Sequence, residues 1–256
     1  MSANRWILGG AVALIAAFAV FFLFRSDGSE ASDGQTPVSL PAGLERSELE
    51  TVIREYILAN PEIIPEAMER LQQRRMGEMV SAIRTELETP FEGAWAGAAD
   101  ADVTIVEFFD YACGFCRTSL PDLERLLAED DNLRVVFREL PILSEESVDA
   151  ARVSLSAARQ SEYFAFHRAM FDAGRPGSAT IAEAQRAAGL NEGQVRRDIA
   201  DAAIEAEIQT NRELAGQLQL TGTPAFVIGD QVLAGAVGYE RLRQAVAEAR
   251  AGASGD

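Results

Sequence analysis

One stretch of this chain, Val103-Thr-Ile-Val-Glu-Phe-Phe-Asp-Tyr-Ala-Cys-Gly-Phe-Cys116, carries its strongest structural signal. The first seven residues are mostly β-branched or aromatic and are too few for a helix, so they predict a buried β-strand. The strand signal ends at Asp110, and leucines at helical spacing follow the second cysteine. The pair Cys113 and Cys116 therefore lies where a strand gives way to a helix.

The position of this Cys-x-x-Cys pair predicts redox chemistry. The first turn of a helix presents free backbone N–H groups and the positive end of the helix dipole, which favour the thiolate of Cys113 over the thiol. Cys113 and Cys116 are the only cysteines of the chain, and their spacing allows a small reversible disulfide. A structural staple is the alternative, but so short a loop stabilises little. Half of a zinc site is the other alternative, but two cysteines and one histidine are too few for a structural zinc ion.

Composition excludes several other kinds of function. The formal net charge is −17, from 40 acidic and 23 basic residues, and every basic residue is arginine. A surface this acidic argues against nucleic acids and anionic membrane surfaces as partners. The absence of lysine excludes Schiff-base chemistry. The length of 256 residues allows one large domain, or one domain with appendages.

The strand, the Cys-x-x-Cys pair and the helix resemble a thioredoxin fold. Phe108-Phe109, the long middle of the chain and Thr223-Pro224 narrow the resemblance to the DsbA-like branch, over about Asp102 to Arg250. The expected fold class is therefore α/β, a thioredoxin-like domain over residues 91–250 with a helical insertion. The resemblance implies thiol–disulfide exchange without a cofactor or a metal.

The same resemblance assigns roles around the cysteines. Cys113 is the expected nucleophile and Cys116 the resolving thiol. Glu107 interrupts an apolar strand at the place of the family's buried acid, where burial is expected to raise its pKa and suit it to carry a proton for Cys116. The alternative is a glutamate exposed at a sheet edge.

Four more residues are expected to contact the substrate. Gly114 and Phe115 separate the two cysteines, and Thr223-Pro224 opens a later strand. A trans proline at a strand edge is the ordinary interpretation of Pro224. The resemblance instead implies a cis proline that faces the cysteines and leaves the neighbouring backbone free to pair with a substrate strand. His167, the lone histidine, is interpreted as a satisfied, partly buried helix residue rather than as a general base.

Helix signals fill the chain between the second strand, 133–140, and the third, 225–228. The expected insertion spans about residues 144–218, with helices starting at Ser144 and Ser161 and capping boxes at Thr180 and Asn191. Gly229-Asp230 predicts a hairpin turn, and a closing helix is expected from residue 239. The tail, 251–256, is expected to be irregular.

The amino-terminal region predicts export. Trp6–Phe24 is an uncharged apolar run close to the ~20 residues that span a bilayer. The domain boundaries expected from this pattern are a membrane anchor at 1–25 and a flexible linker at 26–43. A cleaved signal peptide is the alternative. The expected location is the bacterial inner membrane with the catalytic domain in the periplasm, or a soluble periplasmic protein after cleavage.

A helical extension is expected at residues 44–90. A capping box at Ser47 begins it, and an apolar stripe continues from Met68 toward Leu87 with its spacing broken between Leu71 and Met76. Such a stripe either packs on the catalytic domain or self-associates. Some DsbA-like proteins, among them ScsC-type isomerases, carry a similar extension that oligomerises them, so the resemblance implies a homo-oligomer.

The expected function is thiol–disulfide exchange with the cysteines of exported proteins, with a membrane partner that recharges the cysteine pair. Gly114-Phe115 and Thr223 resemble the corresponding residues of bacterial disulfide isomerases rather than those of oxidases, which favours isomerase or reductase activity. The alternatives are a DsbA-type oxidase, an electron carrier for cytochrome or metal-site assembly, and a holdase-like binding protein whose disulfide is incidental.

Overall fold

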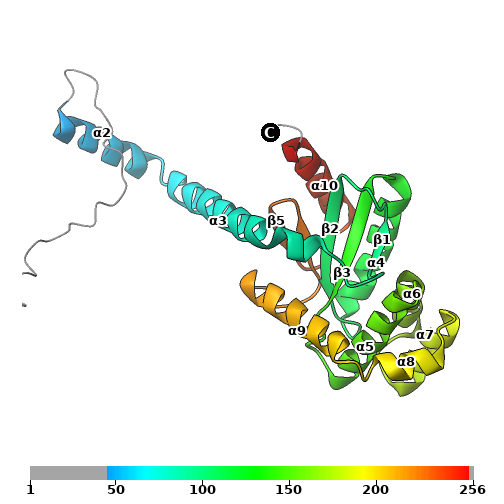
Figure 1. Ribbon diagram of the computed structural model, residues 1–256. Coiled ribbons are helices and arrows are strands. Elements are labelled where there is room, and N and C mark those ends of the chain that lie inside the picture. Colours follow the sequence, from blue (N-terminus) through cyan, green and yellow to red (C-terminus); the bar gives the residue numbers. More distant parts are fainter. Residues whose placement is uncertain (1–44, 254–256) are drawn as a thin grey trace, which may run out of the picture. The chain divides into compact units, whose positions relative to one another are not determined.

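The computed structural model describes residues 45–253 (Figure 1). Two compact units make up the chain. One ends at Pro61 and contains helix α2 (Arg46–Ala59). The other begins at Glu62 and contains the sheet and the other described helices. The expected helical extension, 44–90, is thus divided between the two units.

A mixed sheet of five strands forms the centre of the larger unit, in the order β1-β3-β2-β4-β5. Its strands are β1 (Trp95–Gly97), β2 (Val103–Phe109), β3 (Leu133–Glu139), β4 (Ala225–Ile228) and β5 (Gln231–Ala234). Strands β2 and β3 are parallel, and the other pairs are antiparallel. The two long strands and the β4–β5 hairpin are as expected. The short edge strand β1 was not predicted, because three residues show no alternation of their own.

Two layers of helices cover the sheet (Figure 1). Helices α4 (Gly114–Glu129) and α10 (Tyr239–Ala253) pack on one face, and α3 (Ile63–Glu88) and α9 (Ala202–Gln217) pack on the other. Alternation along β2 sends Glu107 to the face that carries α4. The buried acid and the cysteine helix therefore lie on the same side of the sheet.

Helices also form the expected insertion between β3 and β4. They are α5 (Glu145–Arg159), α6 (Tyr163–Ala173), α7 (Ser178–Ala187) and α8 (Glu192–Asp198), followed by α9. Ser144 and Asn191 cap α5 and α8 as predicted, each accepting a hydrogen bond from the backbone N–H three residues on.

Three predicted helix starts were wrong by one to three residues. Helix α2 begins at Arg46, and the Ser47 side chain makes no cap. Helix α6 begins at Tyr163, two residues after Ser161. Helix α7 begins at Ser178, and Thr180 instead donates its hydroxyl to the carbonyls of Arg175 and Gly177. In each case a Ser or Thr inside the first turn or just before it mimics a capping residue.

Helix α3 changes its surroundings along its length. Its first half exposes Ile64, Met68 and Leu71. From Met76 onward the helix packs on the sheet and buries Val80 and Leu87 in the core beneath β2 and β3. The break in the apolar spacing between Leu71 and Met76 therefore marks the point where the helix meets the catalytic unit.

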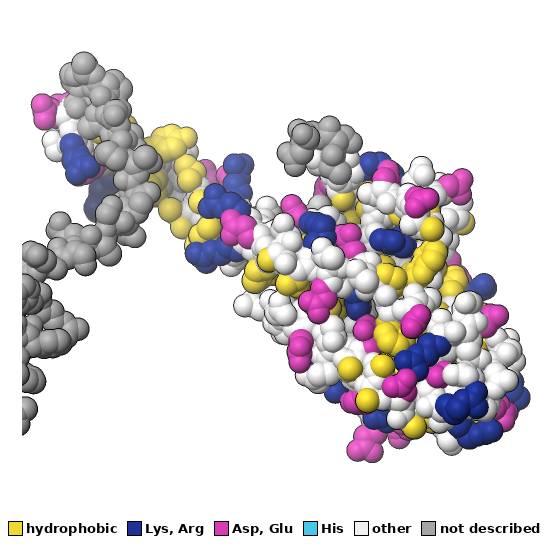
Figure 2. Space-filling view, in the orientation of Figure 1, with side chains coloured by type: hydrophobic (Ala, Val, Ile, Leu, Met, Phe, Trp, Pro, Cys, Tyr) yellow, Lys and Arg dark blue, Asp and Glu magenta, His cyan; other side chains and the backbone are white. Residues whose placement is uncertain are grey.

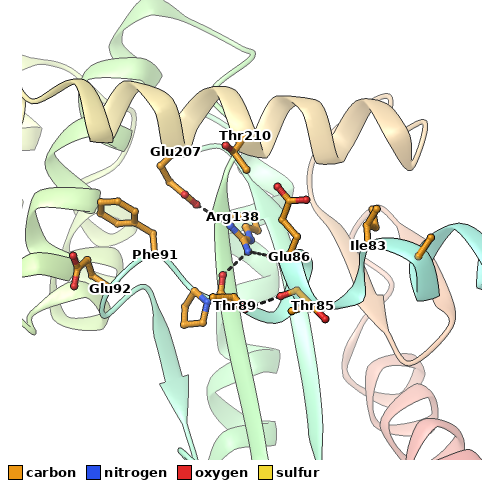
Figure 3. Close-up of a pocket in the computed structure, with 11 residues that line it drawn as sticks. Ile83, Thr85, Glu86, Thr89, Phe91, Glu92, Arg138, Glu207 and Thr210 are labelled. Atoms are coloured by element: carbon orange, nitrogen blue, oxygen red, sulfur yellow. Dashed lines mark hydrogen bonds and ion pairs between the residues drawn. The ribbon is translucent and has the colours of Figure 1, made fainter.

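Arg138 of β3 forms hydrogen bonds with the carboxyl-terminal end of this helix (Figure 3). Its buried guanidinium donates to the carbonyls of Glu86, Leu87 and Thr89, the last at 2.6 Å. It also pairs with the Glu207 carboxylate of α9 at 2.8 Å. These carbonyls have no partner within α3, because a helix leaves its last four carbonyls free. One strand residue thus joins the end of α3 to α9.

Several expectations concern the two ends of the chain. The expected anchor Trp6–Phe24 and linker 26–43 lie outside the described residues. Within residues 45–253, none of the helices is long and apolar enough to cross a membrane. At the other end, α10 continues to Ala253, so the first residues of the expected irregular tail are helical.

Candidate active site

The turn between β2 and α4 places Cys113 directly before the first residue of the helix. Asp110 shapes this turn. Its Oδ1 accepts a hydrogen bond from the N–H of Ala112 at 2.7 Å, and its carbonyl accepts one from the N–H of Cys113 at 2.9 Å. An aspartate that bonds the backbone two residues on stabilises a tight turn. Cys113 is thereby held at the amino end of α4, as the sequence predicts.

The two thiols have different surroundings. Cys113 is 6% exposed, and its Sγ donates to the carbonyl of Thr223 at 3.2 Å. Cys116, one turn into α4, is fully buried. Burial, together with the nearby Glu107 carboxylate, raises the pKa of the Cys116 thiol well above its usual range. Both cysteines are free thiols in this structure. Cys113 is thus the outer thiol and Cys116 the inner one.

Glu107 is buried near both cysteines, not exposed at an edge. Only 2% of the residue is exposed, and it lies in the middle of β2 opposite Phe137 and Phe226. Burial raises the pKa of Glu107 to about 8, and negative charge on Cys113 adds to the rise. A carboxyl group with this pKa can take up or release a proton near neutral pH.

The loop that precedes β4 faces Cys113. The Thr223–Pro224 peptide bond is cis, as the family resemblance implies. The Thr223 carbonyl contacts the Cys113 sulfur, and the Pro224 carbonyl accepts a hydrogen bond from the N–H of Gly235 after β5. Phe115, next to Gly114 in the first turn of α4, is 67% exposed. The structure thus brings Cys113, Thr223 and Pro224 together from distant parts of the chain.

Asp110 also makes a contact that sequence reasoning missed. Its Oδ2 accepts hydrogen bonds from the N–H groups of Ile142 and Leu143, both at 2.8 Å. Their side chains are about half exposed. The aspartate therefore ties the loop after β3 to the turn that carries Cys113. The turn itself has a local signal, because Asp110 ends an apolar strand and can accept a hydrogen bond from the N–H two residues on.

His167 belongs to a buried polar cluster behind this turn. Its Nδ1 lies 3.2 Å from the Tyr111 hydroxyl, which lies 2.8 Å from Ser154 Oγ. Nearby, the Tyr163 hydroxyl donates to the buried Glu139 carboxyl group at 3.0 Å. Burial lowers the pKa of His167 to about 3, so the ring is neutral at physiological pH. His167 is thus a helix residue as expected, but it is fully rather than partly buried, and its Nε2 has no hydrogen-bond partner among the described residues. The cluster supports Tyr111, two residues before Cys113.

Comparison with known families gives two matches. Residues 104–247 match the family described as "DSBA-like thioredoxin domain". Residues 45–76 match the family described as "Copper resistance protein ScsC N-terminal domain". The first match covers the sheet from β2, the cysteine pair and the insertion. The second covers α2 and the exposed first half of α3.

Solved structures agree with these matches. A thioredoxin-like oxidoreductase from Silicibacter pomeroyi is 39% identical over 61% of this chain and 91% of its own, with a TM-score of 0.58. The thiol-disulfide exchange protein alpha-DsbA2 from Wolbachia pipientis is 28% identical over 70% of this chain and 97% of its own, with a TM-score of 0.65. A linker-deletion mutant of Proteus mirabilis ScsC is 27% identical over 84% of this chain and 99% of its own, with a TM-score of 0.61.

The curated relatives are much longer proteins. Na(+)/H(+) antiporter NhaA 3 of Salinispora tropica is 28% identical over 162 residues, which are 61% of this chain and 24% of the antiporter. Antiporter NhaA 1 of Salinispora arenicola is 27% identical over 159 residues, again 24% of its length. This chain thus spans about a quarter of the length of these two antiporters.

Proposed function

Because this chain belongs to the family of DSBA-like thioredoxin domains, we propose that it exchanges its Cys113–Cys116 pair with the thiols and disulfides of exported proteins. We propose further that it acts as an isomerase or reductase. The observation that carries the exchange reaction is the position of the Cys113 sulfur, 3.2 Å from the Thr223 carbonyl beside the cis proline. A substrate backbone that pairs at this loop would bring its own sulfur to the same place.

The reaction has two steps of sulfur exchange. The Cys113 thiolate attacks one sulfur of a substrate disulfide, forms a mixed disulfide and releases the other substrate sulfur as a thiolate. In reduction, Cys116 then attacks the Cys113 sulfur, so the substrate gains two electrons and the cysteine pair loses two. In isomerisation, a second substrate thiolate resolves the mixed disulfide and the cysteine pair ends reduced.

Glu107 has a role in the resolving step. Cys116 holds its proton firmly because it is buried, and only its thiolate attacks. Glu107, with a pKa of about 8, is the buried group whose carboxylate accepts that proton, directly or through a water molecule. In the reverse direction the protonated carboxyl group returns it.

The residues around Cys113 favour isomerase or reductase activity. Gly114 and Phe115 have no polar side chain that could donate a hydrogen bond to a thiolate. The reduced form is therefore stabilised less than in the most strongly oxidising members of the family. Its reduction potential is expected below the roughly −120 mV of such oxidases.

The amino-terminal helices support self-association. Val52, Ile53 and Tyr56 of α2 are exposed, as are Ile64 and Met68 of α3. Figure 2 shows hydrophobic side chains gathered over the first turns of α3. Exposed apolar side chains on each of the two helices are typical of an interaction surface. The match of residues 45–76 to the ScsC N-terminal domain points to the same region. Several copies joined there would place several cysteine pairs around one misfolded substrate.

We place the catalytic unit outside the cytoplasm, where disulfides persist. This placement rests on the family and on the apolar segment Trp6–Phe24, either as an anchor in the inner membrane or as a cleaved signal. A membrane protein that keeps the cysteine pair reduced would be the partner of an isomerase there.

One experiment decides the direction of the reaction. The equilibrium of the cysteine pair with glutathione is measured together with the refolding of scrambled ribonuclease. We expect a potential well below −120 mV and recovery of ribonuclease activity. A potential near that value without unscrambling would identify an oxidase. No exchange with glutathione, together with suppression of aggregation, would identify a holdase.

A further inference from the structure

A groove of about 1020 Å³ follows the outer edge of β5. Every residue from Asp230 to Gly235 lines it, so the groove extends along the whole strand. Gln72, Gln73 and Met76 of α3 form one wall. Helix α3 packs against β5 within the larger unit, so this wall is part of the catalytic fold.

The groove begins at the candidate active site. Thr223 and Pro224 line its near end, and the Thr223 carbonyl contacts the Cys113 sulfur at 3.2 Å. The N–H of Gly235, at the end of β5, donates to the Pro224 carbonyl at 2.8 Å. A polypeptide bonded to the Cys113 sulfur can therefore pass directly from the cis-proline loop to the edge of β5.

The edge of β5 determines what kind of chain fits the groove. In the described sheet β5 is the last strand and pairs only with β4. Its outer side presents backbone N–H and C=O groups over four residues, or about 13 Å at the rise of a β-strand. An extended polypeptide supplies the matching donors and acceptors, as in other cases of β-strand addition.

The walls of the groove favour uncharged side chains. Met76, Leu220 and Val232 are partly buried hydrophobic residues of one cluster, and all three line the groove. On the other side, Arg241 and Glu248 lie 3.5 Å apart. Gln231 joins them, because its amide donates to Glu248 at 2.8 Å and accepts from Arg241 at 2.6 Å. Asp230, the third charged residue of the lining, pairs with Arg84 of α3. Every carboxylate in the lining therefore has an arginine partner, and the groove presents an apolar wall beside paired charges.

We propose that this groove binds an extended, uncharged segment of the polypeptide whose cysteine reacts with Cys113, and that Met76 of α3 selects its side chains. The inference rests on the proposed thiol–disulfide exchange and adds a substrate-binding wall to it. It gives α3 a role in choosing substrates that is separate from any role in self-association. A protein substrate is then distinguished from a small disulfide such as oxidised glutathione, which has no strand to add to β5.

The first test compares two disulfides as substrates of the reduced full chain. One is oxidised glutathione. The other is a synthetic peptide of about eight residues, long enough to cover β5, with alternating apolar residues and one cysteine held as a mixed disulfide with glutathione. The ratio of the two rate constants, peptide over glutathione, should fall roughly tenfold in Met76→Glu, because one apolar contact is replaced by a buried charge. Ile199→Glu, an exposed apolar residue outside the groove, should leave the ratio unchanged.

An equal ratio in wild type and Met76→Glu would overturn the proposal while leaving thiol–disulfide exchange intact. Failure of wild type to react with either disulfide would overturn both. N-methylation of the peptide at alternate residues beyond the cysteine's neighbours should also lower the ratio, because it removes donors to the β5 edge. An unchanged ratio would show that no strand is added.

The second test locates the bound peptide directly. In Cys116→Ala the peptide stays attached to Cys113, and a photoreactive residue in its sequence should crosslink to α3 near Met76. Crosslinks only to the exposed side of Phe115 would place the peptide elsewhere and overturn the proposal. Loss of the α3 crosslink at higher protein concentration would mean that a second copy of the chain fills the groove, which also overturns it.

Discussion

Cys113 and Cys116 lie in different surroundings, which is why we propose different roles for the two thiols. Cys113 precedes the helix and has its sulfur at a loop carbonyl, whereas Cys116 is one turn deeper with no exposed surface. Glu107 is equally buried, but its pKa of about 8 leaves it able to titrate near physiological pH. The chemistry at this scale follows from burial, since desolvation disfavours the charged form of each buried acid.

Alkylation should distinguish the two thiols. The fully reduced protein, treated briefly with iodoacetamide at mildly acidic pH, should be labelled first at Cys113, because Cys113 keeps some exposed surface while burial shields Cys116 and raises its pKa. Peptide mass spectrometry gives the order of labelling. Urea-unfolded protein serves as the control and should show no preference. Faster labelling of Cys116 in the folded protein would reverse the assignment of nucleophile and resolving thiol.

Glu107→Gln should slow the resolving step. The substitution keeps the shape of the side chain but removes a base, which typically costs roughly 100-fold in rate. In wild type, the resolution of a Cys113–glutathione mixed disulfide should accelerate as the pH rises through about 8, where Glu107 loses its proton. Rapid acid quenching followed by chromatography measures the rate. Identical pH profiles in the two proteins would show that the carboxyl group takes no part.

The same substitution makes a prediction for stability. The pKa of Glu107 is about 8 in the folded protein, against 4.5 for an exposed glutamate. The folded state therefore holds this proton more tightly, and its stabilising contribution is complete below pH 4.5 and lost as the pH rises to about 8. The slope is about 1.4 kcal/mol per pH unit. In urea unfolding of the reduced protein, the stability of Glu107→Gln should not fall in this way. The variant's free energy of unfolding should therefore increase relative to that of wild type as the pH rises from 4.5 to about 8. A constant difference would contradict the raised pKa.

At the scale of elements, the two halves of α3 have different surroundings. Its exposed start carries Ile64 and Met68, and its end is packed under the sheet and fastened by Arg138. The strand that bears Arg138 also bears Glu139 on its opposite face, beside Tyr163. β3 thus contacts α3 on one side and the polar cluster behind the cysteine turn on the other.

Arg138→Leu should destabilise the catalytic unit by about 3 to 5 kcal/mol, the usual cost of breaking a buried ion pair and leaving its partner buried. The loss arises because the carbonyls at the end of α3 and the Glu207 carboxylate would lose their arginine partner. Urea unfolding measures it. Arg70→Leu removes an arginine from an exposed pair with Glu66 on the same helix and should cost less than about 1 kcal/mol. An equal decrease in the free energy of unfolding in the two variants would show that the buried contacts of Arg138 stabilise the protein no more than an exposed ion pair does.

At the scale of the whole molecule, the chain combines a catalytic unit with a helical region that exposes apolar side chains. Truncation at Phe91, a simple way to remove the helices, would also remove Val80 and Leu87 from the core. Substitutions on the exposed side chains are therefore the sharper test of self-association. The substituted proteins should remain soluble enough to measure, because the net charge of −17 opposes nonspecific aggregation.

The fragment from Ser26 onward should form a defined oligomer, and the double variant Ile53→Asp with Met68→Asp should be a monomer. Both side chains are about half exposed, so the change places charges where we propose that another copy packs. Multi-angle light scattering gives the mass of each species. Arg54→Asp, which reverses a charge at an exposed residue of the same helix as Ile53, should leave the oligomer intact. A monomeric wild-type fragment would refute the proposed self-association.

Sequence reasoning was strongest where the signal is local. The strand before the cysteines, the helix after them, and the caps at Ser144 and Asn191 depend on residues within a few positions of one another. Alternation and helical spacing report directly on such elements. The cis peptide at Pro224 came from family resemblance, not from any local pattern. The three-residue strand β1 was missed because it exists only by pairing with β3.

Only the tertiary structure decided which distant groups meet. The Cys113 sulfur contacts the carbonyl of Thr223, a residue 110 positions away, and Asp110 bonds Ile142 and Leu143 across the sheet end. Such contacts depend on how whole elements pack, which neither propensity nor periodicity encodes. The groove beside β5 has the same origin, because one wall comes from α3 and the other from the last third of the chain. The chemistry of the cysteine pair was therefore readable in the sequence, whereas the surface that surrounds it required the fold.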